Sequence, residues 1–558
     1  MKNENIASVA NNFATSIAEN VKQIIHHCNI DTSEVRISPM SNSMFMEPTS
    51  EEEIFNILNG HNINKGPGID RIRAIDLKTH ADVFTQPIMN IVNKSFDECS
   101  LPSLMKTAIV KPIYKNGLKT DVNNYRPISI LPIIEKIIEE IACKRLWGYL
   151  SKNNIMSKNQ YGFQKGKNIN KLLAYFTDHL NQNLSKGLHS LVLFVDFSKA
   201  FDTLSHDKLL SVLSSYGVRG KCYDWFKDYL FNRSYSVKIQ NAQSVTVQLE
   251  SGVPQGSKLG PILFIVFINS IMNNLKRSKI FAYADDIAII VTHKNLDNAI
   301  DILQKEFNKL LRWAHDFGLI INEKKTKIMH FTTSKKPQQI IRVVYHTYDC
   351  LHNTEEEKCN KCNTEIEKVD CIKYLGVYVD SKLKWHEHIK YLQGKIRRAA
   401  YVLRHLSYCS NRNVLKIVYF SLAESYFRYG ISAWGLSSGV KKLEKMQKSL
   451  WKIIGSSNTG IAEFLYVNDL FKLTMIDMFH NAKEYKVELE HNHSTRRKAE
   501  GRFRVEKFQN TYGKMTLSVM IPTLLNELPV DLLKNDSEKT CKRTMKNYLL
   551  KKHEQGNI

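Results

Sequence analysis

The spacing of hydrophobic residues divides this chain into a mixed part and a helical part. Up to about residue 335, short runs rich in β-branched and aromatic residues alternate with amphipathic helical patterns. These patterns predict strands over residues 107–113, 190–195, 235–239 and 280–291, and helices over residues 133–150 and 296–317. Strands mixed with packing helices predict an α+β fold, with helices on one face of the sheet.

From His388 onward the pattern is helical. Apolar residues recur at steps of three and four, with Lys and Arg opposite them, and they are Ile389, Leu392, Ile396, Ala399, Leu403 and Leu406. At the other end, residues 1–50 are polar with few periodic signals, and we expect a linker or lead-in there. Ser50 and the three glutamates after it predict a helix start, and the Gly and Pro of residues 64–68 predict a loop.

The composition is that of a folded chain with a large basic excess. A length of 558 residues exceeds what one hydrophobic core usually supports, so we expect two to four structural units. The formal net charge is +24, and residues 381–558 hold 32 Lys and Arg against 16 Asp and Glu. Such an excess favours a polyanionic partner, because each Lys or Arg placed on a phosphate releases counterions. A basic surface that is merely solvated is the alternative.

The sequence offers little sign of export or membrane insertion. The N-terminus lacks the apolar core of a signal peptide, and the longest apolar run, residues 262–268, is far shorter than a membrane span. Ten scattered cysteines fit a reducing compartment. We therefore expect an intracellular protein, in the nucleus or the cytoplasm, with no membrane partner.

Two apolar, β-prone segments contain aspartates, and a charged residue in such a segment requires a physical explanation. Asp196 ends the strand-forming run in LVLFVDFSKAFD, and Asp285 and Asp286 interrupt FAYADDIAIIV. Adjacent carboxylates at a hairpin tip resist burial unless a cation compensates them, and oxygen-only ligands favour Mg²⁺ or Mn²⁺. If folding brings the three together, two metal ions would activate a hydroxyl and stabilise a leaving pyrophosphate. An ordinary turn at Asp285 is the alternative.

The motifs around these aspartates resemble those of a known family. FVDFSKAFD at residues 194–202 and YADD at 283–286 resemble two signature motifs of reverse transcriptases, and SGVPQGSKL at 251–259 resembles a third. Further matches in the family's order are NYRPIS at 124–129, QYGF at 160–163, GLIINEKKTKIMHF at 318–331 and YLG at 374–376. The ordered set resembles the polymerase of non-LTR retrotransposons, nearest to the jockey-like kind.

The resemblance implies an RNA-directed DNA polymerase of retrotransposition with a right-hand fold. Fingers and palm are expected over residues 51–384, a helical thumb over 385–460 and a basic helical C-terminal region over 461–558. The expected partners are an RNA template, a DNA primer or target DNA, and deoxynucleoside triphosphates. The expected cofactors are two Mg²⁺ or Mn²⁺ ions.

The family's functional residues carry over position by position. The resemblance makes Asp196, Asp285 and Asp286 catalytic, and adds the Phe197 backbone carbonyl as a metal ligand. The residues expected to contact the nucleotide are Arg126, Lys115, Gln255, Phe201 and Lys325. Phe201 would exclude a 2′-hydroxyl, and Lys325 would lie near the pyrophosphate. Tyr374, Leu375 and Gly376 would form the turn that grips the primer.

Several of these roles have plain alternatives. Phe201 would otherwise be a core residue, Lys115 a solvated surface lysine and Gln255 a turn residue. Lys324 and Lys327 compete with Lys325. For the whole chain, a silent remnant that only binds RNA is an alternative, and so is an intron maturase or a telomere-extending enzyme. Jockey-like relatives normally carry an endonuclease domain ahead of the polymerase, and we expect none here, nor a ribonuclease H carboxylate set after residue 400.

A group of cysteines lies between residues 345 and 373. Cys359 and Cys362 form a CxxC pair, and Cys350 is a third candidate for a zinc ligand, with His352 and Cys371 nearby. One CxxC with two further ligands would hold a structural zinc ion tetrahedrally. Free thiols in a polar hairpin loop are the alternative.

Overall fold

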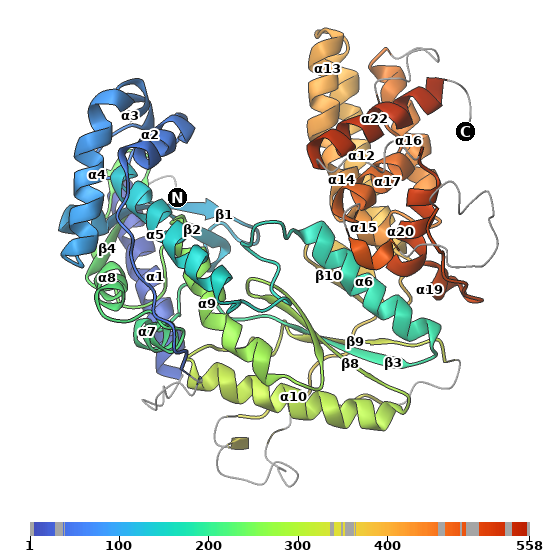
Figure 1. The fold of residues 1–558 in the computed structure, drawn as a ribbon, viewed down its shortest axis with the longest axis horizontal. Helices are drawn as coiled ribbons and strands as arrows, with labels where there is room; N and C mark the ends of the chain where they lie inside the picture. Colours follow the sequence, from blue (N-terminus) through green and yellow to red (C-terminus); the bar gives the residue numbers. More distant parts are fainter. Residues whose placement is uncertain are drawn as a thin grey trace.

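The computed structural model describes most of the chain. The described residues are 5–27, 37, 39–334, 340–347, 350–351, 362, 364–455, 464–479, 482–486, 502–529 and 538–554. Strands occupy the middle of the molecule, and helices from the N-terminal and C-terminal parts of the chain stand on opposite sides of them (Figure 1).

The central sheet has four strands in the order β7–β8–β3–β9, and each neighbouring pair is antiparallel. Its strands are β3 (His189–Val195), β7 (Lys279–Tyr283), β8 (Asp286–His293) and β9 (Lys327–Phe331). The strand predicted over residues 190–195 is confirmed, and the run over 280–291 forms the hairpin β7–β8.

Helices cover both faces of this sheet, so the expectation of one covered face is wrong. Leu191 and Leu193 pack in one core with α9 (Leu259–Asn274) and α10 (Leu296–Asp316). Val192, which points the other way, packs in a second core with α6 (Ile169–Ser185) and the C-terminal helices. Because successive strand residues face opposite sides, an unbroken apolar run is typical of a strand that is buried on both.

A second sheet lies beside the N-terminal helices (Figure 1). Its strands are β1 (Thr107–Tyr114), β2 (Tyr125–Ile130), β4 (Arg233–Ile239), β5 (Ala242–Gln243) and β6 (Val247–Leu249). β1 pairs with β2 in antiparallel fashion and with β4 in parallel fashion. The strands predicted over residues 107–113 and 235–239 are confirmed.

The expectation of a linker over residues 1–50 is wrong for its first half. Helix α1 (Ile6–His27) packs against β4 and β5, and it buries Phe13 and Ala14 in a core shared with Tyr235. Its apolar residues Val9, Phe13 and Ile17 recur at steps of four on the contact face. The sequence therefore carries a helical pattern here that the expectation of a linker did not take into account.

The remaining helices of the first part surround these sheets. They are α2 (Glu51–Gly60), α3 (Ala74–Thr79), α4 (Ala81–Asp97), α5 (Ile133–Lys152), α7 (His206–Ser215) and α8 (Lys221–Leu230). Ser50 caps α2 as predicted, since its side chain accepts a hydrogen bond from the Glu53 amide. Helices α5 and α10 confirm the two predicted over residues 133–150 and 296–317.

Past the hairpin of β10 (Cys371–Tyr374) and β11 (Val377–Asp380), the chain continues in helices. They include α12 (His386–Leu406), α13 (Arg412–Tyr419), α14 (Ser425–Arg428), α15 (Ile431–Trp434), α16 (Val440–Ile453), α17 (Val467–Phe479), α19 (Thr511–Lys514), α20 (Leu517–Asn526) and α22 (Glu538–Glu554). The predicted stripe is confirmed in α12, which buries Ile389, Leu392, Ile396, Ala399 and Leu403. Among the described helices, none has the length and apolar character needed to cross a membrane.

Candidate active site

Three aspartates from two distant segments meet at one end of the central sheet. Asp196 follows the last residue of β3, and Asp285 lies in the two-residue turn between β7 and β8. Val195 pairs with Ile287, so Asp196, the next residue along the chain, lies opposite Asp286 at the start of β8. Asp196 also acts electrostatically on both Asp285 and Asp286. The strand register therefore gathers the three carboxylates that the sequence singled out.

The surroundings of Asp285 and Asp286 oppose the ionisation of their carboxyl groups. Burial raises the pKa of Asp285, and the charge of Asp196 raises it further. Burial, Asp285 and Asp196 together raise the pKa of Asp286 to about 6. A bound divalent cation would reverse this preference and keep Asp285 and Asp286 ionised.

One oxygen of Asp196 is suited to receive such a cation. Its Oδ2 atom is buried and accepts no hydrogen bond, and it forms an ion pair with Lys325, whose Nζ lies 3.5 Å away on a side chain that is 67% exposed. A buried carboxylate oxygen that accepts no hydrogen bond is costly, and a metal ion would give it a closer positive partner than this lysine. The carboxylates are hard oxygen donors, which fit Mg²⁺ or Mn²⁺. Phe197 is buried and pairs with Ile321, and its carbonyl stays a predicted ligand.

A buried glutamine holds the turn that carries Asp285. Gln160 is 1% exposed, and its Oε1 atom accepts hydrogen bonds from the Ala284 amide at 2.9 Å and the Gly162 amide at 2.8 Å. Ala284 has a φ of 55°, a conformation that residues with a side chain rarely adopt. The QYGF motif carried the resemblance, but its glutamine was given no role in the sequence analysis.

Gly162 of the QYGF motif lies where a larger residue would not fit. The Tyr161 amide donates to the Ala282 carbonyl at 2.7 Å, so the segment runs alongside β7. A Cβ atom added to Gly162 would lie 2.6 Å from the Ala284 amide nitrogen. The absence of a side chain thus permits the close approach on which the Gln160 contacts depend.

Two cations from the second sheet face the carboxylates. In the β1–β2 hairpin, Arg126 pairs with Ile113, and the Lys115 amide donates to the Asn124 carbonyl at 2.8 Å. Both side chains are exposed. Arg126 and Lys115 each act to lower the pKa of Asp285, against the larger effect of its burial. Both predicted nucleotide contacts therefore lie within electrostatic reach of the aspartates.

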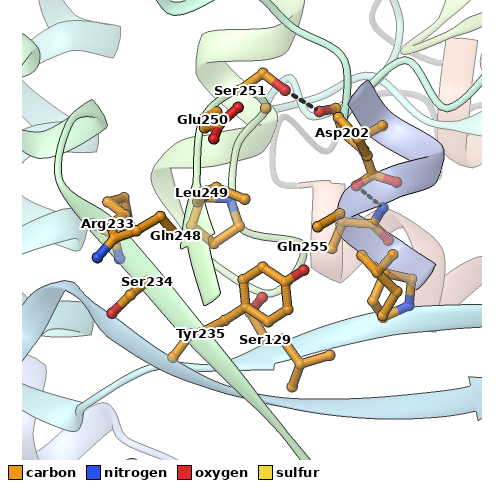
Figure 2. Close-up of a pocket in the computed structure, with 18 of the residues that line it drawn as sticks. Ser129, Asp202, Arg233, Ser234, Tyr235, Gln248, Leu249, Glu250, Ser251 and Gln255 are labelled. Atoms are coloured by element: carbon orange, nitrogen blue, oxygen red, sulfur yellow. Dashed lines mark hydrogen bonds between the residues drawn. The ribbon is translucent and has the colours of Figure 1, made fainter. Parts of the chain in front are cut away.

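Gln255 is engaged with a carboxylate that the sequence analysis left without a role. Its Nε2 atom donates to Asp202 Oδ1 at 2.7 Å, and Ser251 Oγ donates to the Asp202 carbonyl at 2.9 Å (Figure 2). The Ser129 amide donates to the Gln255 carbonyl at 2.7 Å, which ties this loop to β2. Burial raises the pKa of Asp202, whereas Gln255 acts to lower it. The pocket drawn in Figure 2 lies beside this pair.

Phe201 and the three competing lysines lie in different surroundings. The Phe201 ring is half-buried and stacks on Phe264, with centroids 4.2 Å apart. Lys327 is engaged elsewhere, because its Nζ atom contacts Glu367 at 2.6 Å. Lys325 reaches Asp196, and Lys324 is exposed. The structure thus separates Lys325 from its competitors by position.

Comparison with known proteins agrees with this geometry. Residues 113–379 match the family described as reverse transcriptase (RNA-dependent DNA polymerase). The chain carries a reverse transcriptase domain. This domain includes all three aspartates and extends from β1 to β11.

Curated proteins of mobile elements are similar to this chain. The chain is 26% identical over 442 residues to the probable RNA-directed DNA polymerase from transposon BS of Drosophila melanogaster, covering 75% of this chain and 46% of the relative. It is 26% identical to the RNA-directed DNA polymerase from mobile element jockey of the same species, covering 75% and 45%. A Pol polyprotein from retrotransposable element R1 of Bradysia coprophila is 24% identical, covering 67% and 36%. The chain spans less than half the length of these relatives.

The YLG motif forms a tight turn, and Tyr429, the residue that follows α14, holds it. Leu375 and Gly376 have φ of 46° and 80° between β10 and β11. Tyr429 Oη donates to the Leu375 carbonyl at 2.9 Å, and a Cβ atom on Gly376 would lie 2.9 Å from the Tyr429 ring. Tyr374 is buried, and its Oη donates to the Phe281 carbonyl at 3.2 Å. Tyr429 had no role in the sequence analysis, because only folding brings it to the motif.

Three cysteines of the group, Cys350, Cys362 and Cys371, lie within the described residues. Cys350 and Cys362 lie together with His346, which the sequence analysis did not consider. Cys359 and His352 lie outside the described residues, and Cys371 is the first residue of β10.

Proposed function

We propose that this chain is an RNA-directed DNA polymerase of retrotransposition, which extends a primer 3′-hydroxyl with deoxynucleoside triphosphates on an RNA template. The observation that carries the proposal is the meeting of Asp196, Asp285 and Asp286 at one end of the central sheet, where a buried oxygen of Asp196 accepts no hydrogen bond. The reverse transcriptase domain and the similarity to RNA-directed DNA polymerases of mobile elements support the same activity.

Asp196, Asp285 and the Phe197 carbonyl would hold two Mg²⁺ or Mn²⁺ ions, with Asp286 beside them. Such ions, when bound, favour the deprotonated primer hydroxyl and stabilise the charge of the leaving pyrophosphate. The chain itself would hold the three carboxylates in fixed positions. The hydrogen-bonded pair β3–β8 fixes two of the carboxylates, and Gln160 fixes the turn that carries the third.

The other predicted residues would act on the substrates. Arg126 and Lys115 would bind the triphosphate, because both are exposed cations that face Asp285. Lys325 would neutralise the pyrophosphate as its charge grows. Phe201, seated on Phe264, would present its ring edge to the incoming sugar and clash with a 2′-hydroxyl. Gln255 would hold Asp202, the residue after Phe201, in place through its hydrogen bond.

The architecture suits a right-hand polymerase. The sheet of β1, β2 and β4 with its helices would serve as fingers, the central sheet as palm, and the helices from α12 onward as thumb. The turn at Leu375 and Gly376 would grip the primer end, with Tyr429 as its support. The basic excess of residues 381–558 would contact the phosphates of template and primer.

Primer extension tests the proposal. The natural chain, supplied with an RNA template, a DNA primer and Mg²⁺, is compared with Asp285→Asn/Asp286→Asn and with the control Asp82→Asn, an exposed aspartate of α4. We expect full-length DNA from the natural chain and the control, and background from the double variant. Equal background from all three chains, with RNA binding retained, would identify a silent remnant that only binds RNA.

A further inference from the structure

A nitrogen and two sulfurs converge away from the carboxylate site. His346, Cys350 and Cys362 each offer one ligand atom, and these atoms lie within 4.8 Å of one another. His346 Nδ1 is 3.3 Å from Cys350 Sγ. His346 and Cys350 are each 7% exposed. Two metal-binding side chains are thus buried in direct contact with each other.

We propose that these three residues bind a structural zinc ion. Tetrahedral zinc with bonds of about 2.3 Å to sulfur and 2.0 to 2.1 Å to nitrogen sets its ligand atoms roughly 3.5 to 3.8 Å apart. The cluster is therefore close to the required spacing. Imidazole and thiolate ligands favour zinc over Mg²⁺, so this site differs in kind from the aspartates. The proposal rests on these three described residues.

The surroundings of Cys362 are those of a metal thiolate. The Thr347 amide donates to Cys362 Sγ at 3.5 Å, and Thr347 Oγ1 lies 3.8 Å from the same sulfur. Donors around a ligating sulfur stabilise its negative charge and fix its direction. Thr347 also follows His346 directly, so one short segment supplies a ligand and the donors for another.

The ion would close the long connection between β9 and β10 against α10. On its way out, this connection is held by Gln304 of α10, which bonds both the amide and the carbonyl of Val344, at 2.7 and 2.9 Å. On its way back, Val344 pairs with Glu365, and the Ile366 amide donates to the Val343 carbonyl at 2.9 Å. The zinc ligands stand at the end of this pairing, where a cross-link removes most freedom from the loop.

The returning chain then runs along the central sheet. The Ile328 amide donates to the Glu367 carbonyl at 2.9 Å, and the Val369 amide donates to the Ile328 carbonyl at 2.8 Å. Ile328 belongs to β9, whose other edge pairs with β3. The site would thus secure an added edge of the sheet and the entry to β10. Its role is structural, and it goes beyond the proposed polymerase activity.

Metal analysis of the purified full-length chain tests the proposal. We expect about one zinc per chain, lost on His346→Ala and on Cys350→Ser, and retained in the control Cys409→Ser, an exposed cysteine outside the cluster. Zinc well below one equivalent in the natural chain would overturn the proposal. Full zinc content in the Cys350→Ser and His346→Ala chains would also overturn it.

A second measurement avoids variants that fold poorly. The natural chain, stripped by a chelator and reloaded with Co²⁺, should show the visible absorption of tetrahedral cobalt with thiolate ligands. Chelation should lower Tm by about 5 °C, because the binding free energy of a structural metal stabilises the fold. Zn²⁺ should restore the Tm, and Mg²⁺ should not. An unchanged Tm after chelation, together with a cobalt spectrum without thiolate bands, would contradict the site.

Discussion

Replacing Gln160 by methionine tests how the catalytic turn is held. The substitution keeps the length of the side chain and removes the acceptor for two buried amides, those of Ala284 and Gly162. Each buried amide left without a partner costs about 1 to 3 kcal/mol, and the better burial of methionine offsets part of that cost. We therefore expect the free energy of unfolding to fall by about 2 to 4 kcal/mol.

The same change should affect catalysis through position. Without its acceptor, Ala284 is free to leave its φ of 55°, and Asp285 moves with it. A displacement of a reacting group by about 1 Å lowers rates by roughly 10- to 100-fold. We expect kcat of primer extension to fall by that factor while the KM for deoxynucleotides changes little, because Gln160 is buried behind the turn.

The assay pairs urea unfolding with steady-state primer extension on an RNA template. Gln86→Met, an exposed position of α4, is the matched control and should leave both unchanged. A Gln160→Met chain with the natural kcat would refute the positioning role. A large rise in KM at unchanged kcat would instead make Gln160 a substrate contact.

Three further predictions concern single residues of the site. Phe201→Ala should keep polymerisation measurable but relax the choice of sugar, and unchanged discrimination in a competition between ribonucleotides and deoxynucleotides would remove that role. Asp286→Asn should raise the Tm of the metal-free chain at pH 8. The folded pKa of Asp286, about 6, exceeds its usual 3.8, so ionisation destabilises the fold above pH 6 and the gain should vanish below about pH 4. A gain that is equal at pH 4 and pH 8 in thermal melts would contradict this linkage. Tyr429→Phe should shorten extension products by weakening the turn at Leu375, whereas Tyr401→Phe, at an exposed position, should not.

Local pattern was enough to predict strands β1, β3 and β4, the hairpin β7–β8, and helices α5 and α10. The strand at 190–195 and the helix at 133–150 have strong periodic or β-branched signals, and both are confirmed. The faces of the sheet were harder, because an apolar run states that a strand is buried without stating what covers it. Helix α1 was missed although Val9, Phe13 and Ile17 recur at helical spacing, because the polar composition of residues 1–50 was taken to indicate a linker.

The residues of the site also divide into those that the sequence predicted and those that it did not. Asp196, Asp285 and Asp286 stood out as charges in apolar runs, and the strand register brings them together. Gln160 and Tyr429 did not stand out, because their partners lie 124 and 54 residues away along the chain. His346 was missed for a related reason, since its role depends on a loop that closes back on itself.

The most direct test of the three-aspartate site is primer extension by Asp196→Asn, because Asp196 comes from a strand remote in sequence from the Asp285 turn. The variant keeps the shape of the side chain and removes its charge. On an RNA template with Mg²⁺, we predict a fall of about 10³-fold in kcat, with unchanged affinity for the primer–template duplex. Extension within tenfold of the natural rate, at normal Tm and affinity, would contradict a polymerase site built on these carboxylates.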